Sequence, residues 1–313
     1  MRRLLAVMGL SFSLVPFLVA PAVAETTRST TRAQIIDDSE DTRQYRYFTG
    51  LMTRPAAAPG HRVGAGVGYH HIEDDAGVSR FRLARFDHEY ALAPETGLYS
   101  SVSALRGDDW SPVIGDVRLT HRFTPILYGE VSAERNYVDT VTAIDNQWDL
   151  KSYSASMDVG PLHHWTLVGA YTFQDIGDDN ERNIYVGRII HDFPWWSPLM
   201  VEGRSRILRS EFNATGYFSP PKLDEHLLAA TYRRPVLDDR WYVSARLGTG
   251  IQRINDGSSE NVFDMEVSFR GWFTDHWGLE TSASCRNTDE FFARGAGDGY
   301  RYCQATAALM RSW

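Results

Sequence analysis

The segment VFDMEVSFRGWF (262–273) has one apolar and one charged face when it is extended. Successive side chains of a β-strand point to opposite sides of the sheet. Phe263 and Met265 therefore share one face, whereas Asp264 and Glu266 share the other. Such a segment suits a strand with an apolar environment on one side and water on the other.

The same alternation recurs along most of the chain. WYVSARLGTGIQ (241–252) repeats it, and WTLVGAYTF (165–173) places aromatic residues at both ends of its apolar face. Aromatic strand ends are typical of the two interfaces of a membrane. From His61 onward the pattern predicts about 14 strands, with 12–16 allowed, and no segment shows a helical period.

The connections between these segments fall into two classes. ALAPET (91–96) is short, whereas QDIGDDNERN (174–183) is long and polar, and the two classes alternate. Transmembrane β-barrels have short periplasmic turns and long outer loops. The sequence thus predicts an all-β, antiparallel transmembrane outer-membrane β-barrel over 61–313. A soluble β-domain is the alternative, although its strands would average about 5–6 residues.

The first residues have the features of a secretory signal peptide. Arg2 and Arg3 precede the apolar run Leu4 to Val19, and a small-residue cleavage site ends at Ala24. We therefore expect residues 1–24 to be removed after export. The mature chain is expected in the bacterial outer membrane.

Residues 25–60 form a polar N-terminal segment ahead of the predicted barrel. The part 25–44 has no periodicity and is expected to be flexible. The part 45–55 fits either a strand or a plug-like segment, and the sequence does not choose between them.

The bulk composition excludes several classes of protein. The formal net charge is −8 and no basic run occurs, which argues against a nucleic-acid partner. No segment after the signal peptide approaches 18 uninterrupted apolar residues, so a helical membrane protein is excluded.

The chain has two cysteines, Cys285 and Cys303. If the last hairpin turns near Arg294, they lie opposite one another on adjacent antiparallel strands. An exported protein can form a disulfide there. Two small, unbonded residues on the barrel wall are the alternative.

If the apolar faces meet lipid, the opposite faces line a lumen. The charged residues predicted to line it are Arg80, Arg82, Asp116, Arg118, Arg122, Glu130, Glu134, Asp158, Glu202, Arg204, Arg206, Arg246, Asp264, Glu266, Arg270, Glu280 and Arg286. This mixed lining indicates either a hydrated passage or a closed lattice of ion pairs. About 14 strands lie nearer to the 16–18 that leave an aqueous channel than to the eight that do not.

The loop GYFSPP (216–221) interrupts the strand pattern, because two prolines cannot continue a central strand. Its residues Gly216, Tyr217, Phe218, Ser219 and Pro220 are followed by LDEHLLAATYRRP and RWYVSARLGTGIQ. This arrangement resembles the GYFSP stretch in the C-terminal outer-membrane barrel of the C-type cellulose synthase subunit family. Exopolysaccharide-export porins carry a similar segment.

The resemblance implies an outer-membrane pore for export of a cellulose-like or related glucan, with passive passage coupled to an inner-membrane synthase. Members of that family carry tetratricopeptide repeats before the barrel, and the 34-residue period of such repeats is absent here. A separate periplasmic repeat protein is therefore an expected partner, beside the polysaccharide chain, outer-membrane lipid and lipopolysaccharide. The motif itself is expected to form a rigid loop or a sugar-stacking lip.

Recognisable catalytic and metal-binding patterns are absent from the sequence. The chain has no GxSxG elbow, and adjacent histidines such as His70 and His71 point to opposite faces of a strand, which prevents easy chelation. We expect no enzyme activity, metal or cofactor. The alternative to an export pore is a non-conducting or small-solute barrel with a structural, adhesive or envelope-modifying role.

Overall fold

The computed structural model describes residues 27–38, 42–55, 58, 60–196, 198–214, 216–237, 240–288 and 301–313. The predicted signal peptide and its cleavage site after Ala24 lie outside these residues. Within the described ranges, no helix is long and apolar enough to cross a bilayer.

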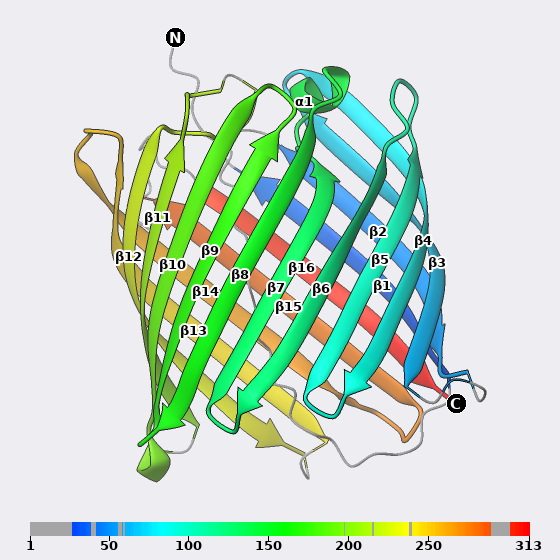
Figure 1. The fold of residues 1–313 in the computed structure, drawn as a ribbon, viewed down its shortest axis with the longest axis vertical. Coiled ribbons are helices and arrows are strands. Elements are labelled where there is room, and N and C mark those ends of the chain that lie inside the picture. Colours follow the sequence, from blue (N-terminus) through cyan, green and yellow to red (C-terminus); the bar gives the residue numbers. More distant parts are fainter. Residues whose placement is uncertain are drawn as a thin grey trace.

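Sixteen antiparallel strands in the described residues form one closed barrel (Figure 1). Each strand pairs with the next along the chain, and the last pairs with the first. Closure leaves no unpaired sheet edge, as lipid requires. The elements are β1 (Thr27–Asp38), β2 (Arg43–Thr53), β3 (His61–Asp74), β4 (Gly77–Ala93), β5 (Thr96–Arg106), β6 (Val113–Thr124), β7 (Leu127–Tyr137), α1 (Val141–Asp145), β8 (Asp149–Leu162), β9 (Trp165–Ile176), β10 (Asn180–Asp192), η1 (Pro194–Trp196), β11 (Leu199–Ser210), β12 (Lys222–Val236), β13 (Trp241–Ile254), β14 (Ser259–Trp272), β15 (Trp277–Thr288) and β16 (Arg301–Ser312).

The fold class is confirmed, and the strand count is at the upper end of the predicted range. The additional strands are β1 and β2, so the barrel begins at Thr27 rather than at His61. The sequence pattern did not predict a strand at β1 because its outward face carries small residues such as Ser29, Thr31 and Ala33. Both faces of β1 are therefore weakly apolar, although its backbone pairs with β2 and β16.

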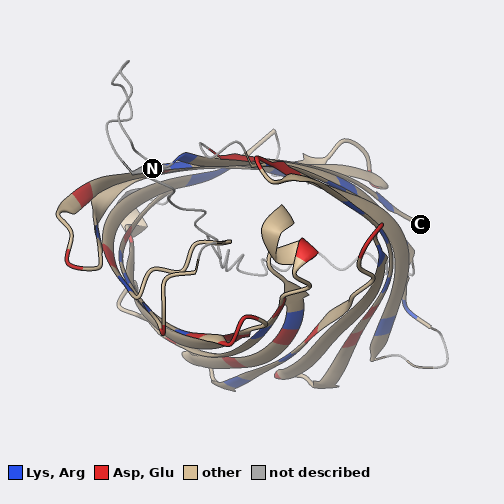
Figure 2. Cartoon of the chain, turned by 90° about the horizontal axis from the view of Figure 1, so that it is seen from above, with Lys and Arg blue, Asp and Glu red and all other residues tan. Residues whose placement is uncertain are grey.

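The inner face of the barrel is identified by the short helix α1. Figure 2 shows α1 inside the ring of strands, where it packs against Ile72 of β3 and Phe81 of β4. Directly opposed residues of two paired strands lie on the same face of the sheet. The strand pairs therefore identify the inward-facing residues of every other strand. On the opposite face, Val67, Leu228 and Leu247 are 59, 60 and 68% exposed. A belt of exposed apolar side chains of this kind belongs in lipid.

The two ends of the barrel differ in their connections. At one end the loops are longer, and these include the segment with α1 and residues 211–221 (Figure 1). At the other end, turns of two residues join β4 to β5, β6 to β7 and β8 to β9. Outer-membrane barrels place their long loops outside the cell. We call the end with the long loops the extracellular end.

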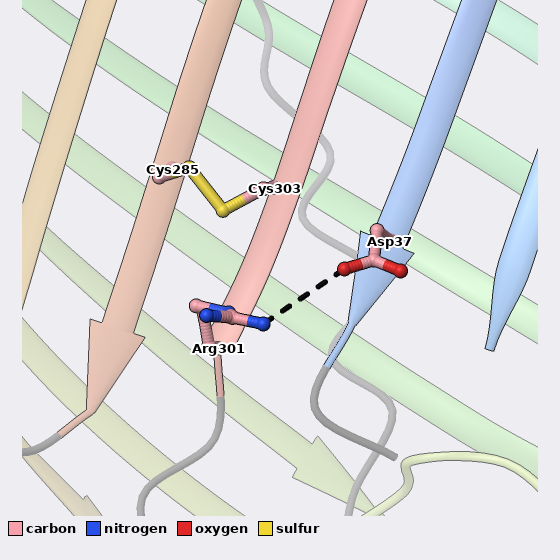
Figure 3. Close-up of a disulfide and its surroundings, with 4 residues drawn as sticks. All are labelled: Asp37, Cys285, Arg301 and Cys303. Atoms are coloured by element: carbon pink, nitrogen blue, oxygen red, sulfur yellow. Dashed lines mark ion pairs between the residues drawn. A yellow bond between two sulfur atoms is a disulfide. The ribbon is translucent and has the colours of Figure 1, made fainter. Parts of the chain in front are cut away.

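A disulfide joins the last two strands. Cys285 of β15 and Cys303 of β16 are direct partners in register, and their Cα atoms lie 4.1 Å apart. Figure 3 shows the disulfide between these strands, beside Arg301, whose guanidinium lies 3.9 Å from the carboxylate of Asp37 on β1. The register places both cysteines on the outer face of the barrel.

Candidate functional site: the lumen and the loops at its mouth

The inner face carries most of the charged residues that the sequence predicted to line a lumen. Alternation and register place them on the same face as Ile72 and Phe81. The residues on this face are Asp116, Arg118, Arg122, Glu130, Glu134, Asp158, Glu202, Arg204, Arg206, Arg246, Asp264, Glu266, Arg270, Glu280 and Arg286.

The prediction was wrong for Arg80 and Arg82, which lie on the outer face of β4. Phe81, between them, points inward and is 1% exposed. The sequence rule places apolar side chains outward, but near the extracellular end α1 supplies an apolar neighbour inside the barrel. The apolar face of β4 is therefore turned inward there, and both arginines are turned outward.

One part of the inner wall, on β10 to β15, is a lattice of ion pairs. Arg188 of β10 binds Glu202 of β11 through two hydrogen bonds, with Nε to Oε1 at 3.0 Å and Nη2 to Oε2 at 2.7 Å. Arg246 of β13 also approaches Glu202, at 3.6 Å. The side chain of Glu202 is only 4% exposed, so its charge depends on these arginines.

The lattice continues toward β15. Arg246 Nη1 donates to Asp264 Oδ2 at 2.7 Å. Glu225 of β12 accepts from Arg204 at 3.3 Å and forms an ion pair with Arg286. Its side chain is 2% exposed. Some of these pairs join neighbouring strands, whereas the pair of Glu225 with Arg286 reaches from β12 to β15 across the inner wall. Together they constrain the side chains of this region.

The inner wall on β5 to β9 has a different composition, which we call the hydroxyl strip. We give this name to the serine, threonine and carboxylate side chains that share this wall with Arg118 and Arg122 of β6, namely Ser101, Ser103, Asp116, Glu130, Ser132, Glu134, Ser152, Ser154, Ser156, Asp158 and Thr172. Ser154 and Thr172 share a hydrogen bond of 2.8 Å. Within the described part of the chain, none of the four carboxylates forms an ion pair. Hydroxyls and carboxylates of this kind can bind the hydroxyl groups of a sugar.

The mouth of the lumen at the extracellular end is partly filled by α1. Val141 and Ile144 of this helix are buried in an apolar cluster with Ile72, Phe81 and Tyr137. The cluster lies inside the barrel because the helix enters the ring of strands (Figure 2). The segment between β7 and β8 is therefore a packed part of the interior.

The GYFSP motif packs against the segment that carries α1. Thr140 Oγ1 donates to the carbonyl oxygen of Gly216 at 2.7 Å, and the ring of Trp148 meets that of Tyr217 edge to face at 5.9 Å. A Cβ atom added to Gly216 would lie 2.9 Å from the Trp148 ring and 3.0 Å from Thr142. Only glycine fits this close approach of the two loops.

Tyr217 is held by polar partners on the β9 to β10 hairpin. Its hydroxyl donates to Asp178 at 2.8 Å and accepts from Asn180 Nδ2 at 3.0 Å. Asn180 also donates to Ser219 Oγ at 2.8 Å. Burial, reinforced by the hydrogen bond to Asp178, raises the pKa of the Tyr217 phenol above its ordinary value.

Phe218 is directed into the barrel wall. Its ring is 5% exposed and packs with Ile184, Leu208 and Leu223. Arg182 Nη2 donates to its carbonyl oxygen at 2.6 Å. These contacts match the rigid-loop interpretation of the motif, whereas a ring buried to this degree has no free face for a sugar.

Several residues of the site were missed by the sequence interpretation. Arg182 and Arg188 share the inner face of β10. The sequence NERNIYVGRII (180–190) could have predicted this, because alternation places both arginines on the same face. Glu225 was not predicted to face the lumen. The residues after it, 227–230, are apolar on both faces, so alternation does not identify the inner face of this strand. The insertion of α1 into the barrel has no signal in the sequence.

Comparison with known proteins supports the fold. The sequence matches no protein-family model and no curated protein. Among solved structures, a "Bacterial polysaccharide outer membrane secretin" is similar with a TM-score of 0.77 and 14% identity, over 93% of this chain and 100% of that one. CdiB from Acinetobacter baumannii is similar with a TM-score of 0.52 and 9% identity, over 92% of this chain and 60% of that one. The fold is that of an outer-membrane barrel.

Proposed function

We propose that this protein is an outer-membrane pore for the export of an exopolysaccharide, a cellulose-like or related glucan. The observation that carries the proposal is the two-part inner wall, in which an ion-paired lattice on β10 to β15 accompanies the hydroxyl strip on β5 to β9. The lattice pairs charged side chains of the wall with one another. In the strip, Ser103, Ser152 and Thr172 are buried, and its other hydroxyls and carboxylates are the groups proposed to meet water or a sugar chain.

The size of the barrel supports a passage. Barrels of 16–18 strands enclose an aqueous channel, whereas eight strands leave an interior filled by side chains. The similarity in fold to a polysaccharide secretin, and the resemblance of the GYFSP motif to exopolysaccharide-export barrels, support a polysaccharide as the transported molecule. The proposal includes passive passage, with an inner-membrane synthase and a periplasmic repeat protein as partners.

A second candidate function is a non-conducting or small-solute barrel. The observation that favours it is the packing of α1, Tyr217 and Phe218 at the mouth of the lumen. Under this alternative, the loops restrict the passage and the work of the protein is done at its extracellular end.

Single-channel conductance of the refolded barrel in planar bilayers separates these functions. Cello-oligosaccharides and N-acetylglucosamine oligomers are added as blockers, one series at a time. An export pore gives conductance steps that one sugar series interrupts. A small-solute pore gives steps that neither series interrupts, and the absence of steps favours the non-conducting barrel.

The hydroxyl strip can be tested in the same recordings. Ser154→Ala/Ser156→Ala removes two hydroxyls from the strip and adds no atom to the wall. Longer sugar residence in the unchanged protein than in the variant supports the strip as the contact surface. Ser100→Ala is the matched control, because Ser100 lies on the outer face of β5. Equal block of all three proteins contradicts the proposed role of the strip.

A further inference from the structure

Three arginines form a cluster on the outer face near the extracellular end. Arg82 of β4 and Arg106 of β5 are direct partners in register, and both are exposed. Arg80 is two residues away on β4, so its side chain projects from the same face about 7 Å further along the strand. Like charges placed directly opposite one another on neighbouring strands repel.

No ion pair with a described residue relieves this repulsion. In the described ranges, no carboxylate lies within ion-pair distance of Arg80, Arg82 or Arg106. Other basic residues of the same rim do have acidic partners on the neighbouring strand. Arg135 lies 3.1 Å from Asp149, and Lys151 lies 2.9 Å from Asp175. The arginine cluster is therefore a positive site that has no ion-pair partner in the described part of the chain.

The cluster lies at the upper edge of the apolar belt. Going toward the middle of the barrel, the next outward residues are apolar, and Phe86 and Val102 are 48 and 47% exposed. Tyr69 is the direct partner of Arg82, and Tyr47 is the direct partner of Tyr69. Tyrosines at this height mark the interface between lipid tails and headgroups.

We propose that Arg80, Arg82 and Arg106 bind the phosphate groups of an outer-leaflet glycolipid, the lipid A part of lipopolysaccharide. Guanidinium groups bind phosphate through paired, charge-assisted hydrogen bonds. The phosphates of such a glycolipid place negative charge at the level of the three arginines. The acyl chains of the same lipid cover the exposed apolar belt below them. This site goes beyond the pore function, because it faces lipid rather than the lumen.

Binding of lipopolysaccharide to the detergent-solubilised full barrel tests the site by titration calorimetry. The ligands are lipopolysaccharide with phosphorylated lipid A, the same material after enzymatic removal of the phosphates, and inorganic phosphate. The expected result is binding of the first ligand that is at least tenfold tighter than that of the second, which corresponds to loss of about one charged contact. Inorganic phosphate alone is expected to bind too weakly to be measured.

The variant Arg80→Gln/Arg82→Gln/Arg106→Gln is expected to lose the same tenfold or more. Arg135→Gln/Lys151→Gln is the matched control, since it removes rim charges that already have partners. Equal affinity for phosphorylated and dephosphorylated lipid by the unchanged protein overturns the proposal, and this comparison does not require any variant to fold. Equal loss in the control, or tight binding of inorganic phosphate, also overturns it.

Discussion

Arg182 Nη2 donates a hydrogen bond of 2.6 Å to the carbonyl oxygen of Phe218, which joins the inner wall of β10 to the loop at the mouth of the lumen. The carbonyl oxygen and the Phe218 ring are both turned into the barrel. This contact links the loop to a charged side chain of the wall, beside the contacts that Gly216, Tyr217 and Ser219 make with other segments of the chain.

We expect Arg182→Gln to loosen this loop, because the shorter side chain leaves the Phe218 carbonyl without its charged donor. The expected cost is about 1.5–3 kcal/mol of unfolding free energy. Larger current fluctuations in planar bilayers and faster proteolysis within 211–221 measure the effect on the loop. Arg206→Gln is the control, because Arg206 faces the same lumen from β11 and makes no hydrogen bond with the loop in the described residues. Equal effects of the two variants contradict the anchoring role.

We expect Glu202→Gln to destabilise the barrel, because it leaves the charges of Arg188 and Arg246 without their shared carboxylate. Removing one partner of a buried ion pair costs about 3 kcal/mol or more. The midpoint of urea unfolding, followed by the heat-modified migration of the barrel, measures the loss. The reversal potential in a KCl gradient is also expected to shift toward anions if the pore conducts.

Glu266→Gln is the matched control for the lattice. Glu266 faces the lumen from β14 and forms no ion pair with a described residue. The variant Glu266→Gln removes the same charge as Glu202→Gln. We therefore expect a similar shift in reversal potential with little loss of stability. A loss of stability equal to that of Glu202→Gln speaks against the lattice as a stabilising structure.

We expect Cys285→Ser/Cys303→Ser to unfold more readily than the oxidised protein. The disulfide closes a loop with a sequence separation of 18, and closing a loop of that length restricts the unfolded chain by about 3 kcal/mol. Conductance is expected to be unchanged, because both side chains lie on the outer face. The comparison uses denaturant unfolding with and without reductant, and a reductant effect on the double variant shows that another cause is present.

We expect the contribution of the Tyr217 hydroxyl to the stability of the folded protein to decrease at alkaline pH. Its pKa is raised in the folded protein by burial and by the hydrogen bond to Asp178, so the folded state retains the proton longer than the unfolded state does. The contribution is therefore complete below about pH 10, the ordinary pKa of tyrosine, and declines as the pH rises above it. The stability advantage over Tyr217→Phe is expected to shrink in that range.

Tyr232→Phe is the control for this pH dependence. Tyr232 lies on the outer face of β12 and is 43% exposed. Both variants are compared with the unchanged protein between pH 8 and about pH 11. A Tyr217→Phe difference that changes with pH no more than the Tyr232→Phe difference contradicts the proposed coupling between the phenol and the loop.

Residues 80–90 show where sequence reasoning about the faces succeeds and where it fails. In the lower half of β4, charged Arg85 and Asp87 point inward and Phe86 points outward, as alternation in a membrane barrel predicts. In the upper half, Phe81 and Leu83 point inward and the arginines point outward. A strand has one register throughout, so the two halves cannot both obey the apolar-outward rule. Because α1 packs against the inner face of the upper half, the upper half is the one that departs from the rule.

The sequence by itself determined the closed antiparallel architecture and the inner position of most of the charged residues. These follow from local periodicity, because each strand must present one face to lipid and the other to water. Only the tertiary structure decided that Thr27–Thr53 supplies two strands, that α1 and the GYFSP loop pack inside the mouth, and that Arg80 and Arg82 face outward. Those features depend on contacts between residues far apart in the chain, which bury apolar side chains where local alternation predicts polar ones.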